Sequence, residues 1–179
     1  SGRKQGNLPD AADLFVAFGH EDAADYVREM DLDDALVTVT YKADGVDYAR
    51  EFFASYPDKV GAMRFTASKK GALSFTLRAH VPYLDAKPPM DRTGSVDAKG
   101  DEIVLVAKSG AYGVKLAGRF KVMCDGKMTA HTDGSLKVED ATVATVVYTL
   151  ATNYRFVPEM FEASKGQCSD REYDRSPYF

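Results

Sequence analysis

The chain has 179 residues, of which 45% are hydrophobic and 28% charged, and its formal net charge is −4. This length and composition predict one globular domain, large enough to enclose a hydrophobic core. Acidic and basic residues are mixed along the chain, which argues against nucleic-acid binding because such proteins usually carry a basic stripe. No apolar run approaches the roughly 20 residues of a membrane-spanning helix. We therefore expect neither nucleic acid nor a membrane among its partners.

The first residues, SGRKQGNLPD, lack the apolar core that follows the basic residues of a signal peptide. We interpret residues 1–12 as a leader that carries the remnant of an expression tag, Ser1 and Gly2. Two cysteines, Cys124 and Cys168, are too few for a disulfide framework. The sequence therefore leaves open whether they pair and in which compartment the protein works.

A β-hairpin is the clearest local signal in the chain. Residues 35–41 (ALVTVTY) and 46–53 (VDYAREFF) alternate with a period of two, which predicts two strands. Asp44 and Gly45 lie between them. They predict a type I′ turn, because that turn needs a positive φ at both central positions.

The same pattern of short strands and Gly-containing turns repeats along the chain. The further predicted strands are residues 60–67, 73–80, 102–109, 113–123, 127–132, 135–139 and 142–152. Many short strands at regular spacing predict an all-β fold, a sandwich or a barrel.

Three segments do not follow this pattern. Residues 21–30 (EDAADYVREM) predict two helical turns, and residues 158–164 (PEMFEAS) predict one and a half. Residues 80–101 are rich in Pro, Gly and Asp and predict a long connection between sheets or along an edge. The polar residues 165–179 predict a segment that leaves the domain.

Charged residues of the hairpin region are candidates for a site, but they are better explained as framework. Four acids, at positions 29, 31, 33 and 34, lie close together, yet they lack the ligand spacing and the glycine of a calcium loop. We expect them to form a solvated turn. Arg50 and Glu51 should face opposite sides of their strand, and we expect Arg50 to pair with a carboxylate on a neighbouring strand.

The sequence also lacks a recognisable catalytic or metal-binding pattern. His20, His80 and His131 lie far apart, and none has a second His or Cys at metal-ligand spacing. The chain contains neither a Gly-x-Ser-x-Gly motif nor a phosphate-binding loop. Among the acids, no spacing singles out a glycosidase pair. We therefore assign no catalytic residue, no metal and no cofactor to this chain.

Aromatic residues are a further candidate, since the chain has ten Tyr and ten Phe but no Trp. Exposed rings can stack on the apolar faces of sugars. Tyr83, Tyr112 and Tyr154 lie in or near predicted loops, and we take them as candidate carbohydrate contacts. The alternative is that the tyrosines close the core with the hydroxyl group at its edge.

Residues 26–58 resemble a segment of glycoside hydrolase family 95 enzymes, and residues 118–155 continue the resemblance. The family pattern in the first segment is roughly Y-x-R-x-L-D-L-x-x-A, a strand, and then D-G-V-x-Y-x-R-E-x-F-x-S-x-P-D. This chain matches it at Tyr26, Arg28, Asp31, Leu32, Ala35, Asp44, Gly45, Val46, Tyr48, Arg50, Glu51, Phe53, Ser55, Pro57 and Asp58, with Met30 in place of Leu. The later segment matches at Leu136, Val138, Ala141, Ala151, Thr152, Asn153 and Tyr154.

The resemblance implies a position within a larger enzyme. Family 95 consists mainly of inverting α-L-fucosidases, with α-L-galactosidases among their relatives, and in bacteria they degrade polysaccharides and are often exported. In these enzymes a β-sandwich of the supersandwich type precedes a helical (α/α)6 barrel that holds the catalytic residues. The resemblance thus implies a sandwich over residues 13–157 and a linker over residues 158–179 that leads to a catalytic barrel. The family's more N-terminal motif is absent here, so an edge of the sandwich is expected to lack strands and to favour self-association.

Three functions remain open from the sequence. The first is a non-catalytic domain that supports the sugar site of a parent glycoside hydrolase. The second is a carbohydrate-binding module that acts alone through its tyrosines. The third is a structural interaction domain with aromatics at a domain interface.

Overall fold

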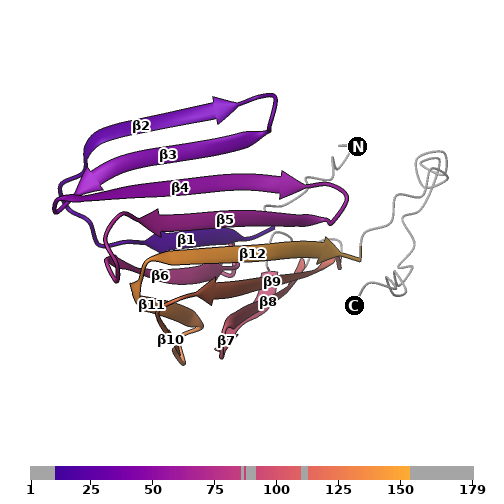
Figure 1. The fold of residues 1–179 in the computed structure, drawn as a ribbon. Helices are drawn as coiled ribbons and strands as arrows, with labels where there is room; N and C mark the ends of the chain where they lie inside the picture. The colour runs from indigo at the N-terminus through magenta and orange to yellow at the C-terminus, as the bar shows by residue number, and fades with distance from the viewer. Residues whose placement is uncertain (1–10, 86, 88–91, 110–112, 154–179) are drawn as a thin grey trace.

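The structure, a computed structural model, describes residues 11–85, 87, 92–109 and 113–153 (Figure 1). These residues form twelve strands in two antiparallel sheets and no helix. The small sheet has the order β1-β6-β11-β10, and the large sheet has the order β2-β3-β4-β5-β12-β9-β8-β7. The strands are β1 (Asp13–Ala17), β2 (Ala24–Asp31), β3 (Leu36–Ala43), β4 (Val46–Ser55), β5 (Val60–Ala67), β6 (Leu73–His80), β7 (Arg92–Lys99), β8 (Glu102–Ser109), β9 (Lys115–Cys124), β10 (Lys127–Ala130), β11 (Ser135–Ala141) and β12 (Val143–Thr152).

The two sheets face each other as a sandwich, so the predicted all-β class is confirmed and the sandwich is the form it takes. Side chains from both inner faces form one core. Its most deeply buried large members come from β5, β6, β8, β9, β11 and β12, and include Phe65, Leu77, Leu105, Phe120, Leu136 and Val146. The core therefore lies where the small sheet covers the middle of the large one.

The predicted hairpin is present as β3 and β4. Asp44 and Gly45 have φ values of 50° and 71°, as the type I′ turn requires. Val39, Tyr41, Val46 and Tyr48 are buried on one face, as the alternation predicts. Residues 60–67, 73–80 and 102–109 form strands with the predicted bounds, and the other predicted strands differ only at their ends.

Two predictions from the Gly- and charge-rich segments were wrong. Residues 21–30 were expected to form helical turns, but Ala24–Asp31 is strand β2, the outermost strand of the large sheet. Residues 80–101 were expected to be a connection, but Arg92–Lys99 is strand β7 at the other edge of that sheet. Both strands gain their hydrogen bonds from a neighbour rather than from a local apolar pattern. The expected helix at 158–164 lies outside the described residues.

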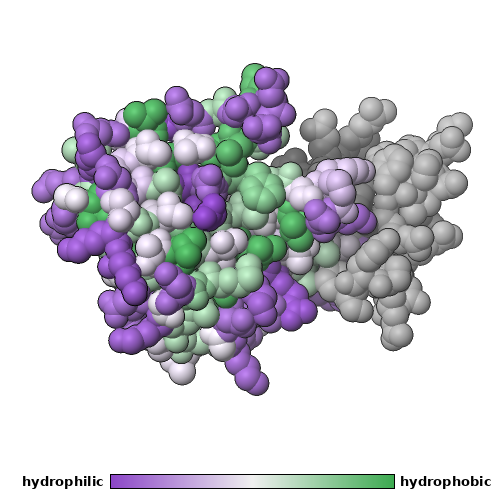
Figure 2. Space-filling model, in the orientation of Figure 1, coloured by the Kyte–Doolittle hydropathy of each residue, from purple (hydrophilic) through white to green (hydrophobic). Residues whose placement is uncertain are grey.

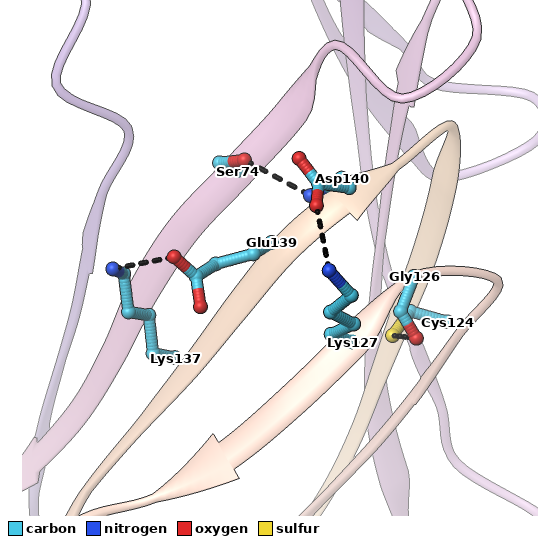
Figure 3. Close-up of polar contacts among 7 residues, drawn as sticks. All are labelled: Ser74, Cys124, Gly126, Lys127, Lys137, Glu139 and Asp140. Atoms are coloured by element: carbon cyan, nitrogen blue, oxygen red, sulfur yellow. Dashed lines mark hydrogen bonds and ion pairs between the residues drawn. The ribbon is translucent and has the colours of Figure 1, made fainter.

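The junction between β9, β10 and β11 shows why a glycine is needed at position 126 (Figure 3). A β-bulge lies between Val138 and Ala141, and Asp140 within it has a φ of 54°. A Cβ atom on Gly126 would lie only 2.3 Å from the carbonyl oxygen of Glu139. Close backbone approach, rather than an unusual φ, therefore requires the glycine here. Polar contacts surround the bulge, including the ion pair at 3.4 Å between Lys127 Nζ and Asp140 Oδ2 (Figure 3).

Apolar side chains also reach the surface, where Figure 2 shows green patches between hydrophilic purple regions. Met30, Tyr56 and Leu32 are 66%, 92% and 82% exposed. Among the described residues, no helix has the length and apolar character needed to span a membrane.

Candidate functional site

The predicted carbohydrate contacts are only partly described by the structure. Tyr83 lies in the turn after β6 with a φ of 64°, and its side chain is 52% exposed. The Arg92 guanidinium carbon lies 5.8 Å from the centroid of the Tyr83 ring. Tyr112 and Tyr154 lie outside the described residues. The structure therefore places one predicted ring at the surface and does not place the other two.

Arg50 lies at the centre of an aromatic cluster on the inner face of β4. Its Nη2 atom donates a hydrogen bond of 2.7 Å to Tyr41 Oη. Its guanidinium carbon lies 4.0 Å from the centroid of the Phe18 ring and 4.6 Å from that of Tyr41. The expectation of a carboxylate partner for Arg50 was wrong. The planar guanidinium instead stacks between aromatic rings, which a point charge such as lysine cannot do as well.

Glu51 faces the opposite side of β4, as the alternation predicts, and its Oε2 lies 3.7 Å from Arg64 Nη1.

One hydrogen-bond donor of Arg50, on the inner side of β4, lacks an acceptor among the described residues. Arg50 Nε is buried and has no hydrogen-bond partner among the described residues. Native structures contain few such buried unpaired donors, so this atom needs an explanation.

His20 completes the cluster from the connection between β1 and β2. Its Nδ1 lies 2.8 Å from Tyr41 Oη, and its ring centroid lies 4.3 Å from that of Tyr48. The Tyr41 hydroxyl accepts from Arg50, and its own proton is available for Nδ1 of a neutral His20 imidazole. Burial, together with the positive charge of Arg50, lowers the pKa of His20 below its ordinary value of 6.5. We call Phe18, His20, Tyr41, Tyr48 and Arg50 the Arg50 cluster.

The Arg50 cluster covers only one half of the inner face of β2, β3 and β4. On the other half, Met30, Val37, Phe52 and Met63 form a row across four strands, since each is the register partner of the next. Met30 is 66% exposed, and the other three are half-buried. We call this row the uncovered face.

The uncovered face continues onto β12 with Tyr148 and Leu150. A Cβ atom on Gly61 would lie 2.2 Å from Tyr148 Cζ, and one on Gly118 would lie 2.7 Å from Leu150 Cδ2. The two glycines thus let both large side chains lie flat on the sheet. Leu150 is nevertheless 40% exposed. The apolar surface on this side is therefore continuous across β2, β3, β4, β5 and β12.

The free edge of β1 borders this surface. β1 pairs with β6 and is the last strand of the small sheet, so its other edge is unpaired within the described residues. Figure 1 shows β2, β3 and β4 extending beyond β1, the outermost strand of the small sheet. The small sheet ends before it covers the large one.

The other residues of the family-95-like motif have structural contacts. Asp31 Oδ1 accepts hydrogen bonds from the backbone N of Asp33 at 2.9 Å and of Asp34 at 3.1 Å, so these three acids form an exposed turn, as predicted. The fourth acid of the predicted turn, Glu29, lies in strand β2 instead. Ser55 Oγ donates to Asp58 Oδ2 at 2.5 Å in the turn after β4. Asx- and Ser-type contacts of this kind fix turns rather than bind ligands.

The next feature is the placement of the side chains that could ligate a metal ion. Within the part of the chain that the structure describes, no group of three or more His, Cys, Asp or Glu side chains could hold a metal ion. Cys124 Sγ lies 3.7 Å from the carbonyl oxygen of Gly126 at the strand end, as expected of a packing residue. The question of a Cys124–Cys168 pair stays open because Cys168 lies outside the described residues. The site that the structure presents is thus a surface, made of the uncovered face and the β1 edge.

Comparison with known proteins defines the class of this sandwich as the N-terminal domain of a glycosyl hydrolase. Residues 2–156 match the family described as glycosyl hydrolase family 65, N-terminal domain, and the chain belongs to this family. It is also 52% identical over 52 residues to alpha-L-fucosidase 2 of Arabidopsis thaliana, which is 29% of this chain and 6% of that protein.

Among solved structures, a putative kojibiose phosphorylase from the human microbiome superposes with a TM-score of 0.49 and 13% identity. The match covers 86% of this chain and 25% of that one. The chain therefore spans only a small part of the length of the relatives it matches.

Proposed function

We propose that this chain is a non-catalytic N-terminal β-sandwich domain that supports the sugar site of a larger glycoside hydrolase. The observation that carries the proposal is membership of a family of glycosyl hydrolase N-terminal domains. The described residues add no catalytic constellation to it, and the conspicuous motif residues are occupied in turns and in the Arg50 cluster.

The finer proposal concerns the parent enzyme. We infer a family-95-like enzyme, an inverting α-L-fucosidase or α-L-galactosidase with an (α/α)6 barrel. The motif from Asp44 to Asp58 and the local identity to an alpha-L-fucosidase support this choice. In this proposal residues 13–157 form the sandwich, and residues 158–179 lead toward the barrel.

The test compares this chain with the full-length protein encoded by its gene. Both are assayed for release of fucose from an α-1,2-fucosylated oligosaccharide and of galactose from an aryl α-L-galactoside. We expect turnover of one substrate by the full-length protein and none by residues 1–179 alone. Turnover by the short chain would overturn the non-catalytic role. A full-length protein that cleaves neither substrate would overturn the family-95-like assignment.

A second candidate is direct carbohydrate binding, and one observation favours it. Phe15 on the outer face of β1 is 55% exposed in an open depression that it lines with Thr76, Arg78 and His80. An exposed ring beside charged hydrogen-bonding groups suits a pyranose. Calorimetric titration with a fucosylated trisaccharide should then show binding that Phe15→Ala or Tyr83→Ala removes, whereas Phe53→Ala should leave it unchanged. No heat of binding to the unmodified chain would exclude this candidate.

A further inference from the structure

We propose that the free edge of β1 and the uncovered face together form the docking site for a β-strand from the rest of the parent polypeptide. The inference rests on the proposed function, because it requires a longer protein. It adds to that function the surface and the kind of contact through which the domain joins its enzyme.

The edge of β1 determines the kind of occupant. An unpaired strand edge presents a row of backbone N–H and C=O groups that another extended chain can pair with. β1 has the sequence DLFVA, and its described residues include neither a proline nor a lysine that would block such pairing. The edge of the large sheet at β2 is better protected, because β2 has a register irregularity between Ala24 and Val27, and Asp25 there has a φ of 52°.

The uncovered face determines the side chains of the occupant. A strand added beside β1 would widen the small sheet by about 5 Å, toward β4, where Phe52 lies beside Val37. Every second side chain of that strand would point at the inner face of the large sheet, because side chains alternate along a strand. Apolar residues at those positions would remove the exposed part of Phe52 from water. The expected occupant is therefore an extended segment with alternating apolar residues.

The unpaired donor of Arg50 lies at the border of this region, two residues from Phe52 on the same face of β4. A backbone carbonyl or a carboxylate of the incoming segment would supply the missing acceptor. Three independent features thus call for the same kind of partner: an unpaired edge, a half-exposed apolar row and a buried donor without an acceptor.

The source of the strand is inferred from sequence and length. Residues 1–10 (SGRKQGNLPD) contain a single large apolar side chain, Leu8, and so lack the required alternation. In residues 154–179, Pro158 soon interrupts the short alternation that begins at Tyr154. The matched segment is 6% of alpha-L-fucosidase 2, so that protein holds ample polypeptide beyond it. We therefore assign the occupant to the parent polypeptide outside residues 1–179.

Hydrogen exchange measured by mass spectrometry on the 179-residue chain and on the full-length protein tests the inference. We expect the amides of β1 to exchange at least about tenfold more slowly in the full-length protein. β10 is the matched control, because it is the opposite edge strand of the same sheet and should change little. Phe52→Asp in the full-length protein should restore fast exchange at β1, with β10 reporting that the sheet itself is intact. Met123→Asp, at an outward-facing position that is 47% exposed, should not.

Equal exchange of β1 in the two proteins would overturn the inference. So would protection that grows with the concentration of the short chain, which would identify a second copy as the occupant. Protection in the short chain that is lost on removing residues 1–10 or 154–179 would identify its own terminus and would also overturn it. The glycosidase assay on the same full-length sample separates the two proposals. Activity without protection of β1 removes only the docking site, and protection without activity removes only the hydrolase function.

Discussion

The two halves of the large sheet have similar strands but different surroundings. In β5, β12, β9 and β8, the inward side chains meet the small sheet, and Phe65, Phe120 and Leu105 are at most 2% exposed. In β2, β3 and β4, only the Arg50 cluster closes one end, and the row from Met30 to Phe52 is half-open. Alternation in the sequence therefore predicts a strand and which side chains share a face. Whether that face is buried depends on another part of the fold or on a partner.

Two phenylalanines on the same inner face, one in each half, should differ most in their contribution to stability. Phe65 is the register partner of Arg50, and Phe52 is the register partner of Met63. Phe65→Ala should lower the free energy of unfolding by about 3–5 kcal/mol, as a large cavity in a closed core does. Phe52→Ala removes fewer contacts and should cost about half as much. Urea denaturation monitored by circular dichroism measures both. Equal losses would show that the two halves are equally well packed in solution.

The junction at Gly126 gives the next effect and sharpens the description of the covered half. Gly126→Ala should destabilise the chain by about 1–3 kcal/mol, because the new methyl group would overlap the backbone of the β11 bulge. Gly100→Ala is a suitable comparison, since nothing lies within 4 Å of that position and only its φ of 61° opposes the change. If Gly100→Ala cost more than Gly126→Ala, backbone conformation rather than close approach would decide these turns.

Tyr41→Phe tests how firmly the Arg50 cluster closes its half. The change removes the hydroxyl group that joins His20 to Arg50 and leaves a second guanidinium donor unpaired. We expect a loss of about 1–2 kcal/mol in the free energy of unfolding. Tyr26→Phe, at an exposed position, is the control and should be neutral. A neutral Tyr41→Phe would mean that ring packing alone holds the cluster.

The smallest effect is a pH dependence from His20. Its pKa is lowered in the folded chain, so the unfolded chain binds the proton first as the pH falls. The stabilising contribution of neutral His20 is therefore complete above pH 6.5, its ordinary pKa, and is lost progressively below that value. Denaturation midpoints between pH 7.5 and pH 5 should fall less steeply for His20→Gln than for the unmodified chain. Parallel slopes would assign the pH dependence to other groups.

Much of this fold could be predicted from the sequence. The strands that form the core carry period-two alternation. The turn at Asp44 and Gly45 was predictable because both central positions of a type I′ turn need a positive φ, which Asp and Gly tolerate. Residues 73–80 were predictable because Leu73, Phe75, Leu77 and Ala79 alternate strictly and are all buried. A strand with one buried and one solvent-exposed face alternates apolar and polar residues, so its sequence predicts it.

The edge strands could not be predicted for the same physical reason. All eight residues of β2 are exposed, so solvent imposes no alternation on ADYVREMD, and its charged residues imitate a short helix. In β7 the sequence RTGSVDAK contains only weak apolar signals, at Val96 and Ala98. β1 has five residues, too few for a convincing period. Pairing with a distant neighbour makes these segments strands.

The candidate site was even less accessible from sequence. The sequence predicted tyrosines as the candidate contacts. The surface that the structure presents is formed by Met30, Val37 and Phe52, whose sequence pattern is that of ordinary strand residues. Arg50 was marked by its motif, but a sequence cannot show that Phe18 and His20, in the connection between the two sheets, would meet it. Only the spatial order of the two sheets shows which face lacks cover.

The exposed strand β2 has one more consequence, for the way the chain comes apart. Because none of its side chains is buried, it is held mainly by its backbone ladder to β3. Such a strand opens without disturbing the core, so it belongs to the least stable cooperative unit of the domain. The adjoining turn, with Leu32 82% exposed, offers a protease its first place to cut. Loss of β2 alone would leave the other eleven described strands and their core standing, as a smaller domain within the domain.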